Sequence, residues 1–248
     1  MLLKVLGLAP LNRELISLPF KEQEVKIFSR FLMYHEVTDR GMTLELISLI
    51  RAGYQPISLG TFVKALRGEI TIPQNFPTFM VTCDDGLLTQ YTQGLRVVAN
   101  VERETGWFVP LTLFVMTRLE GLPNIEEIPD DTPSFNDRVH SYMTKGQIIE
   151  LIKKGHFVEN HTIDHMDITQ LSENERSLQV EGGEERINAL WELAGRERTC
   201  RAFAYPYGRF RGQEKYIESL GYDLAFTTLQ TTQHSSLTPY TLGRIGIT

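Results

Sequence analysis

Val81-Thr82-Cys83-Asp84-Asp85-Gly86 is the stretch that decides the fold, because it joins an apolar run to two adjacent acids and a glycine. Upstream, Phe79-Met80-Val81 is bounded by Pro77 and has the continuous apolar character of a strand buried in a parallel sheet. Apolar residues at helical spacing follow, up to Gly106. The two acids therefore lie at the carboxyl end of a strand and just before a helix, which is the edge of α/β proteins where ligands bind.

The two neighbouring carboxylates, Asp84 and Asp85, are costly to place side by side unless they share a cation or one of them takes up a proton. A metal ion would satisfy this requirement, and the chain offers further ligands later. The other interpretation is that Asp84 caps the following helix and Asp85 is solvated. This stretch alone leaves both interpretations open.

Strands and helices alternate on both sides of the two acids. Further apolar runs indicate strands at 27–37, 109–116, 157–160, 202–205, 224–226 and 244–247. Capping boxes begin two of the helices, at 144–147 and 172–175. The alternation predicts an α/β fold with a parallel sheet, closed into a barrel of somewhat fewer than eight units. We expect residues 1–26 to be a lead-in, residues 27–248 to form the barrel, and residues 118–141 to be a surface insertion.

Composition limits the partners of the 248-residue chain. A formal net charge of −6 argues against a nucleic-acid backbone as the main partner. Cys83 and Cys200 lack the spacing of a metal site and need not pair. The sequence has no run of roughly 18 apolar residues, so it predicts no membrane-spanning helix. The amino terminus lacks the long apolar region of a signal peptide, so the default expectation is a cytoplasmic protein, although a chain trimmed of its signal would look the same.

His161 and His165 are four positions apart, a spacing that puts two imidazoles on the same side of one helical turn. Neutral imidazole suits zinc and related divalent ions, and two histidines with one carboxylate leave positions open for water and substrate. The pair alone is a weak signal, because histidines also cap helices and bond core carbonyls. Like the two acids, however, the pair follows an apolar strand, which places it at the same edge of the sheet.

Three ordered motifs give the chain a resemblance to a known family. Residues 82–86 are similar to the motif TFDDG with cysteine in place of phenylalanine, and residues 161–165 fit H-[ST]-x-x-H. Residues 204–208 are similar to R-x-P-[YF]-G, with alanine in place of arginine. Over roughly residues 31–228 the chain thus resembles the polysaccharide deacetylases that share the NodB homology domain, carbohydrate esterase family 4. The resemblance implies a distorted (β/α) barrel of about seven parallel strands. It also implies a hydrolase that removes N-acetyl groups from amino sugars of a polysaccharide or oligosaccharide.

The resemblance also implies roles for individual residues. Asp85, His161 and His165 would bind a divalent metal, zinc foremost, with cobalt, nickel or manganese as alternatives. Asp84 would be the general base, and the backbone N–H of Tyr207 would donate to the oxyanion. General chemistry agrees with these roles, since a cation lowers the pKa of a bound water and the base then needs only hydrogen-bond reach.

Two features depart from the family pattern. Ala204 stands where an arginine usually braces the base, and Arg201 is out of register by three residues. Either another residue orients Asp84 or the base is held less tightly. The general acid is also not evident, because His234 lies in a polar stretch and not after the usual leucine.

A second candidate for the general acid lies near the amino end. Leu32-Met33-Tyr34-His35-Glu36-Val37 resembles an early strand of the poly-N-acetylglucosamine deacetylase branch, which takes its acid from this Tyr-His position. We therefore prefer His35 over His234. The plainer interpretation is that His35 bonds a neighbouring carbonyl and serves packing.

Other functions stay open. The same residues could act on a non-sugar amide or an O-acetyl ester, and Ala204 leaves room for a non-catalytic carbohydrate-binding protein on the same barrel. A glycosidase that uses Asp84 and Asp85 is disfavoured, because adjacent residues rarely hold carboxyls ~5 Å or more apart across a bond. The sequence does not indicate an oligomeric state.

Overall fold

The main sheet consists of parallel strands, and its order places the two strands nearest the carboxyl terminus at opposite edges. The computed structural model describes residues 17–20, 23–26, 29–72, 77–118, 130–131, 141–230 and 238–247. The strand order is β10-β3-β5-β6-β7-β8-β9, with the short β4 also paired to β5. The strands are β3 (Ser29–Tyr34), β4 (Gln55–Pro56), β5 (Thr78–Asp85), β6 (Leu111–Val115), β7 (Phe157–Asn160), β8 (Ala202–Ala204), β9 (Leu224–Phe226) and β10 (Ile245–Gly246). Seven parallel strands curl into a distorted α/β barrel, which confirms the predicted fold class.

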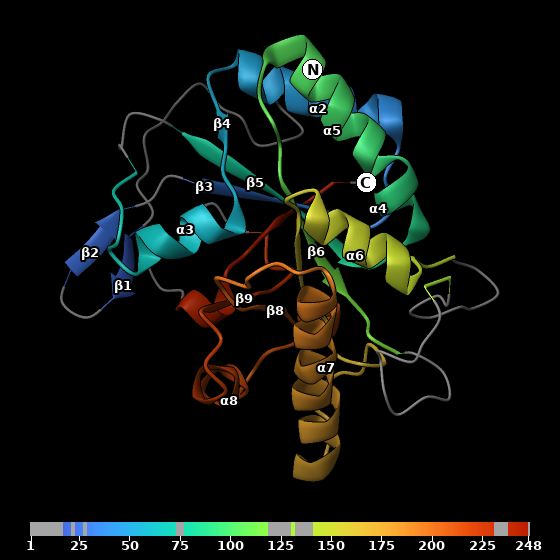
Figure 1. Cartoon of the computed structure of the whole chain (residues 1–248). Coiled ribbons are helices and arrows are strands. Elements are labelled where there is room, and N and C mark those ends of the chain that lie inside the picture. The colour runs from blue at the N-terminus through green and yellow to red at the C-terminus, as the bar shows by residue number, and fades with distance from the viewer. Residues whose placement is uncertain are drawn as a thin grey trace.

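Helices surround this sheet, with α2 and α5 packed together on one side and the long α7 standing apart from them (Figure 1). The helices are α2 (Asp39–Arg51), α3 (Leu59–Leu66), α4 (Leu88–Thr92), α5 (Gly94–Thr105), α6 (Lys145–Lys153), α7 (Glu173–Leu193) and α8 (Glu214–Ser219), with 3-10 turns η2 (Pro206–Gly208) and η3 (Pro239–Thr241). Both predicted capping boxes are present, at Thr144 and Ser172. No helix of the described residues has the length and apolarity that crossing a bilayer requires.

A separate antiparallel hairpin, β1 (Ser17–Phe20) with β2 (Gln23–Lys26), lies within the expected lead-in. Most of the expected insertion at 118–141 lies outside the described residues, so the predicted division of the chain stays a prediction.

The barrel is drawn together by the carboxyl-terminal segment, which contacts both edges of the sheet. Leu242 forms a parallel bridge to Phe226, at the end of β9, and accepts a 2.8 Å hydrogen bond from Thr227 N–H. Three residues on, β10 begins and pairs with β3 at the other side of the sheet. Arg244 lies between these two contacts and is only 1% exposed. The chain therefore places an arginine inside the barrel at the point where its edges approach each other.

Phenylalanine rings and aliphatic side chains fill the interior of the barrel, and polar residues gather at its carboxyl end. Phe226 packs edge-on against Phe31 and Phe114, with ring centroids 5.1 and 5.5 Å apart. Met80 belongs to this inner cluster, whereas Cys83 belongs to the outer cluster beneath the helices. Because side chains alternate along a strand, Asp84 shares the inner face with Met80. Cys83 is fully buried with a free thiol, as expected for an apolar strand residue.

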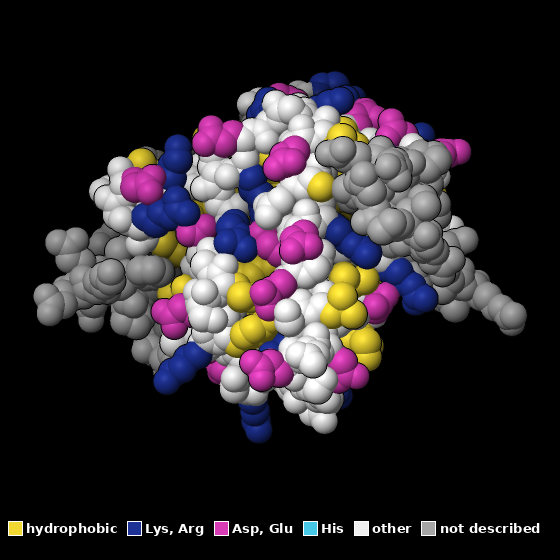
Figure 2. Space-filling view, turned by 60° about the horizontal axis from the view of Figure 1, so that its bottom comes forward, with side chains coloured by type: hydrophobic (Ala, Val, Ile, Leu, Met, Phe, Trp, Pro, Cys, Tyr) yellow, Lys and Arg dark blue, Asp and Glu magenta, His cyan; other side chains and the backbone are white. Residues whose placement is uncertain are grey.

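Charged side chains of both signs are interspersed over the face that Figure 2 shows, without a broad area of one sign among the coloured residues. Such a mixed surface creates no strong local field.

Candidate active site

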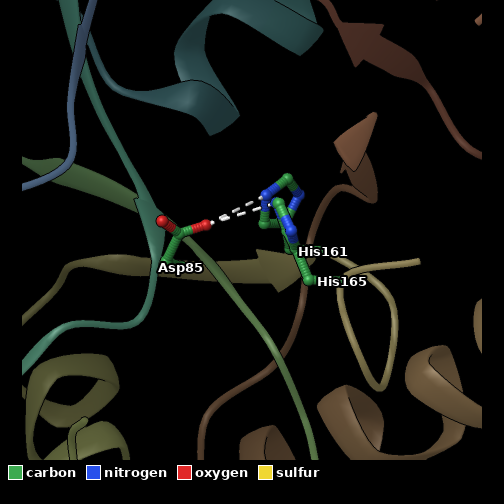
Figure 3. A group of neighbouring side chains, drawn as sticks. All are labelled: Asp85, His161 and His165. Atoms are coloured by element: carbon green, nitrogen blue, oxygen red, sulfur yellow. Dashed lines mark ion pairs between the residues drawn. The ribbon is translucent and has the colours of Figure 1, made fainter. Parts of the chain in front are cut away.

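Asp85, His161 and His165 form the cluster that the sequence predicted. One ligand atom from each residue lies within 4.8 Å of the other two. Asp85 Oδ1 is 3.4 Å from His161 Nε2 and 3.5 Å from His165 Nε2. Figure 3 shows the carboxylate reaching from one strand end towards the two imidazoles on the other side. One carboxylate oxygen and two imidazole nitrogens are a ligand set that divalent metals such as zinc accept.

The register of the sheet explains why these side chains meet. Asp85 on β5 and Asn160 on β7 both pair with Val115 of the strand between them. The loops that follow β5 and β7 therefore leave the sheet at the same level, the first directly after Asp85 and the second beginning with His161.

The loop from 161 to 165 is not helical, so the expectation that the two histidines share one helical turn was wrong. Among the described residues, four non-glycine residues have positive φ: Asp85 (76°), Thr162 (67°), His165 (56°) and Tyr207 (58°). Such a conformation costs about 1–3 kcal/mol for each residue and tends to cluster at functional sites. Two of the three cluster residues thus reach their positions through unfavourable backbone conformations and not through regular helix geometry.

Hydrogen bonding fixes the orientation of the His161 ring. Its Nδ1 lies 2.7 Å from the carbonyl oxygen of Ala204, so Nδ1–H donates there and Nε2 faces Asp85. A backbone carbonyl that fixes the tautomer in this way is typical of metal-binding histidines. Ala204 therefore contributes its main chain to the site, although its side chain departs from the family motif.

The charges around the cluster also suit a cation. Burial raises the pKa of Asp85, but its contact with His161 and the positive charge that the neighbouring imidazoles carry when protonated outweigh this and lower the pKa to about 2. Burial, together with the charge of His161, lowers the pKa of His165 to about 4, so that imidazole is neutral at pH 7. Asp85 Oδ1 is buried and accepts no hydrogen bond among the described residues. An ionised, unpartnered oxygen beside two imidazole nitrogens fits a divalent ion at this point.

Asp84 lies beside the cluster and is held by Arg244. Nη1 of the guanidinium is 2.6 Å from Oδ1, and Nη2 is 2.6 Å from Oδ2. Arg244 Nε also donates to the carbonyl oxygen of Thr227 at 3.1 Å. The guanidinium carbon lies 5.7 and 5.6 Å from the ring centroids of Phe114 and Phe226. Asp84 is thus a buried carboxylate whose two oxygens are fixed in one orientation.

His35 and Tyr207 reach the same region from other elements. His35 is exposed just after β3, and its charge contributes to the electrostatics of Asp85 and His165. Buried Gln90 donates through Nε2 to the carbonyl oxygens of both His35 and Asp84, which ties these two strand ends together. The Tyr207 ring packs on His165 with centroids 4.5 Å apart. His234 lies outside the described residues.

Comparison with known proteins decides the family. Residues 72–225 match the polysaccharide deacetylase family, and this match covers more than half of the chain. The chain belongs to the polysaccharide deacetylase family. A search of curated proteins found no match.

Several solved structures share the fold of this polysaccharide deacetylase family member. IcaB from Ammonifex degensii is 22% identical, with a TM-score of 0.66 over 90% of this chain and 92% of that one. The Streptococcus pyogenes deacetylase PplD in complex with acetate is 19% identical, with a TM-score of 0.66 over 88% and 91%. The BpsB deacetylase domain from Bordetella bronchiseptica is 16% identical, with a TM-score of 0.64 over 88% and 95%. At these identities the likeness shows a shared fold.

Arg244 supplies the guanidinium that the alanine at position 204 cannot provide in this polysaccharide deacetylase. The guanidinium that braces Asp84 comes from the segment that closes the barrel and not from the strand before Tyr207. Sequence reasoning missed Arg244, although it opens the last apolar run of the chain. A charged residue at the start of a run expected to be buried was the available signal, because a buried arginine needs a partner.

A cavity of about 500 Å³ lies beside Tyr207, whose ring packs on His165, and its size suits a small-molecule ligand. Its lining includes Tyr207, Arg209, Phe210, Asp167 and Leu229. Arg209 pairs with Asp167 at 2.8 Å and lies 5.5 Å from the centre of the Tyr207 ring. Tyr207 is 59% exposed, so its ring is available to a ligand in this polysaccharide deacetylase fold.

Proposed function

We propose that the chain is a metal-dependent hydrolase that removes N-acetyl groups from amino sugars of a polysaccharide or oligosaccharide. One observation carries this proposal: the unpartnered Asp85 oxygen faces His161 and His165 beside a buried carboxylate, Asp84, that Arg244 holds in place. The family supports the deacetylase chemistry, and a cavity lined in part by the aromatic rings of Tyr207 and Phe210 supports a sugar as the substrate.

Asp85, His161 and His165 would hold a divalent ion, zinc foremost and cobalt, nickel or manganese as alternatives. When bound, such an ion lowers the pKa of a water and polarises the acyl carbonyl. Asp84 accepts the proton of the attacking water as general base. Each of its oxygens bonds only one Arg244 nitrogen, which leaves a lone pair on each oxygen for that proton.

The remaining two residues act on the acyl group and the amine. The backbone N–H of Tyr207 has no acceptor among the described residues and would donate to the developing oxyanion. His35, exposed beside the cluster, would protonate the departing amine. Both roles follow the family pattern and are part of the proposal.

Acetate release from N-acetylated oligosaccharides tests this function. We expect release that is abolished by a chelator, restored by zinc or cobalt, and lost in Asp84→Asn. Glu104→Gln, which removes an exposed carboxylate on α5, is the matched control and should retain activity. Full activity of Asp84→Asn would remove the assigned base, and release that no chelator affects would remove the metal.

Two alternatives are separated by the same assay. The residues would also serve an O-acetyl ester or a non-sugar amide, so a panel of acetylated sugars, esters and small amides defines the substrate. A non-catalytic carbohydrate-binding protein was suggested by Ala204, but Arg244 supplies the guanidinium that Ala204 lacks. Glycan binding without acetate release from any member of the panel would favour that reading.

A further inference from the structure

The loop that carries His161 and His165 is fastened to a single turn of α7, at 179–183. Asn160 Nδ2 donates to the carbonyl oxygen of Val180 at 2.8 Å. Ile163 N–H donates to the carbonyl oxygen of Gln179 at 3.2 Å. The Gln179 side chain accepts from Asp164 N–H at 2.9 Å and donates to Asp164 Oδ2 at 2.7 Å. We call Gln179, Val180 and Gly183 of α7 the clamp.

Asn160 is the link between the clamp and the loop. Its Oδ1 accepts from the N–H of Thr162 at 2.8 Å, so it fixes the residue that follows His161. Its Nδ2 donates to Val180 O and also to the Tyr222 hydroxyl at 2.7 Å. The amide is fully buried and uses both donors and its acceptor. A carboxylate or an alkyl group could not make all three bonds.

Two adjacent glycines, Gly182 and Gly183, interrupt the middle of this 21-residue helix, where glycine is unfavourable. A Cβ at position 183 would lie 2.7 Å from Asn160 Oδ1 and 3.2 Å from Nδ2. A Cβ at position 182 would meet Ile163 Cδ1 at 3.2 Å and Leu178 Cδ1 at 3.8 Å, which are the far ends of flexible side chains. The glycine at 183 is therefore required by the close approach of the Asn160 amide.

We propose that Asn160 and Gly183 are positioning residues, through which the clamp sets the distance between the imidazoles of His161 and His165. The loop needs such support because Thr162 and His165 adopt left-handed conformations that no regular helix maintains. Hydrogen bonds to the neighbouring helix α7 hold the loop in its conformation, in place of the hydrogen bonds that a regular helix would provide. This inference rests on the proposed metal site and adds the residues that give the site its affinity.

The paired variants Gly183→Ala and Gly182→Ala test the clamp. Both add the same methyl group to the same helix and both favour helix formation, but only the first displaces the Asn160 amide. The measurement is zinc affinity by competition with a chromophoric chelator, together with the visible spectrum of the cobalt-loaded protein. Since changes behind metal ligands typically weaken metal binding 10–100-fold, we expect at least about a tenfold loss in Gly183→Ala. Gly182→Ala should bind zinc within about twofold of the unchanged chain, with the same cobalt spectrum.

A second variant covers the case in which Gly183→Ala does not fold. Gln179→Glu keeps the acceptor for Asp164 N–H but loses the donor to the Asp164 carboxylate. We expect zinc affinity to fall and to recover in Gln179→Glu/Asp164→Asn, because an asparagine amide can donate to the new carboxylate. Such recovery would not occur if the clamp served only packing.

The outcomes separate the clamp from the proposed function. If the unchanged chain binds zinc and Gly183→Ala binds it equally well, or both glycine variants lose affinity equally, the clamp is wrong and the metal site stands. If the unchanged chain binds no zinc, the proposed function fails and the clamp fails with it.

Discussion

Replacing Arg244 with methionine should destabilise the fold, because the change removes the cation from a buried ion pair while keeping most of the side-chain volume. Asp84 is 2% exposed and Arg244 1% exposed, so water cannot replace the lost guanidinium. Removing one partner of such a pair costs about 3–5 kcal/mol, since it leaves an uncompensated buried charge. For a chain of this size each kcal/mol lowers the melting temperature by about 2–4 °C, which gives a decrease of roughly 6–20 °C.

A double-mutant cycle measures this effect by denaturant unfolding at pH 7. Asp84→Asn alone should also be destabilised, because it leaves Arg244 buried without its anion. Arg244→Met/Asp84→Asn should be more stable than the sum of the two single changes by several kcal/mol, as neither charge is then left alone. Arg244→Lys keeps the charge but not the bidentate geometry, so its stability should lie between those of the unchanged chain and Arg244→Met.

The result that refutes this reasoning is additivity of the two changes, or a loss below about 1 kcal/mol in Arg244→Met, which is the range of exposed ion pairs. Either outcome would mean that Arg244 does not hold Asp84 in place. Acetate release should fall in Arg244→Met at pH 7 even after correction for the folded fraction, because Asp84 loses its fixed orientation.

Three further predictions concern single side chains. Burial lowers the pKa of His156 from 6.5 to about 4, and its Nδ1 accepts Leu111 N–H, so the unfolded chain takes up the proton first as the pH falls. Neutral His156 therefore contributes about 3 kcal/mol to the free energy of unfolding above pH 6.5, and this contribution is lost as the pH falls from 6.5 to 4. The free energy of unfolding of His156→Asn should depend less steeply on pH in this window, and an unchanged slope would contradict the assignment. His35→Asn should lower kcat by about 10²–10⁴ with zinc affinity unchanged, and an unaltered kcat would transfer the acid role to His234. Tyr207→Gly should keep kcat within a few-fold, because the proposed oxyanion donor is the backbone and glycine accepts φ of 58°, whereas KM should rise; loss of kcat would show that the side chain takes part in the chemistry.

The fold and the cluster of Asp85, His161 and His165 could be predicted because their signals are local. The apolar run before Asp84 fixes a buried strand, and the acids and histidines each follow the end of such a strand. The carboxyl ends of parallel strands lie at one edge of the sheet. Side chains that are distant in sequence can therefore be predicted to meet there even when the tertiary contacts are unknown. The capping boxes were read correctly for the same reason, since each involves only four consecutive residues.

Contacts that depend on how the barrel closes could not be predicted. Arg244 meets Asp84 across 160 positions, and the pairing exists only because the carboxyl-terminal segment contacts both edges of the sheet. The histidine spacing was interpreted through a helical turn, whereas the loop obtains the same convergence from left-handed residues and from α7. The close approach of Gly183 to Asn160 is likewise invisible in sequence, because a glycine inside a helix only signals an unfavourable residue.

Anomalous diffraction from zinc-soaked crystals tests the central claim most directly. We expect one strong peak about 2.0–2.2 Å from a carboxylate oxygen of Asp85 and from Nε2 of both His161 and His165, with Asp84 outside the coordination sphere and still paired to Arg244. A zinc peak that lacks any of these three ligands, or crystals saturated with zinc that show no peak at the cluster, would contradict the account.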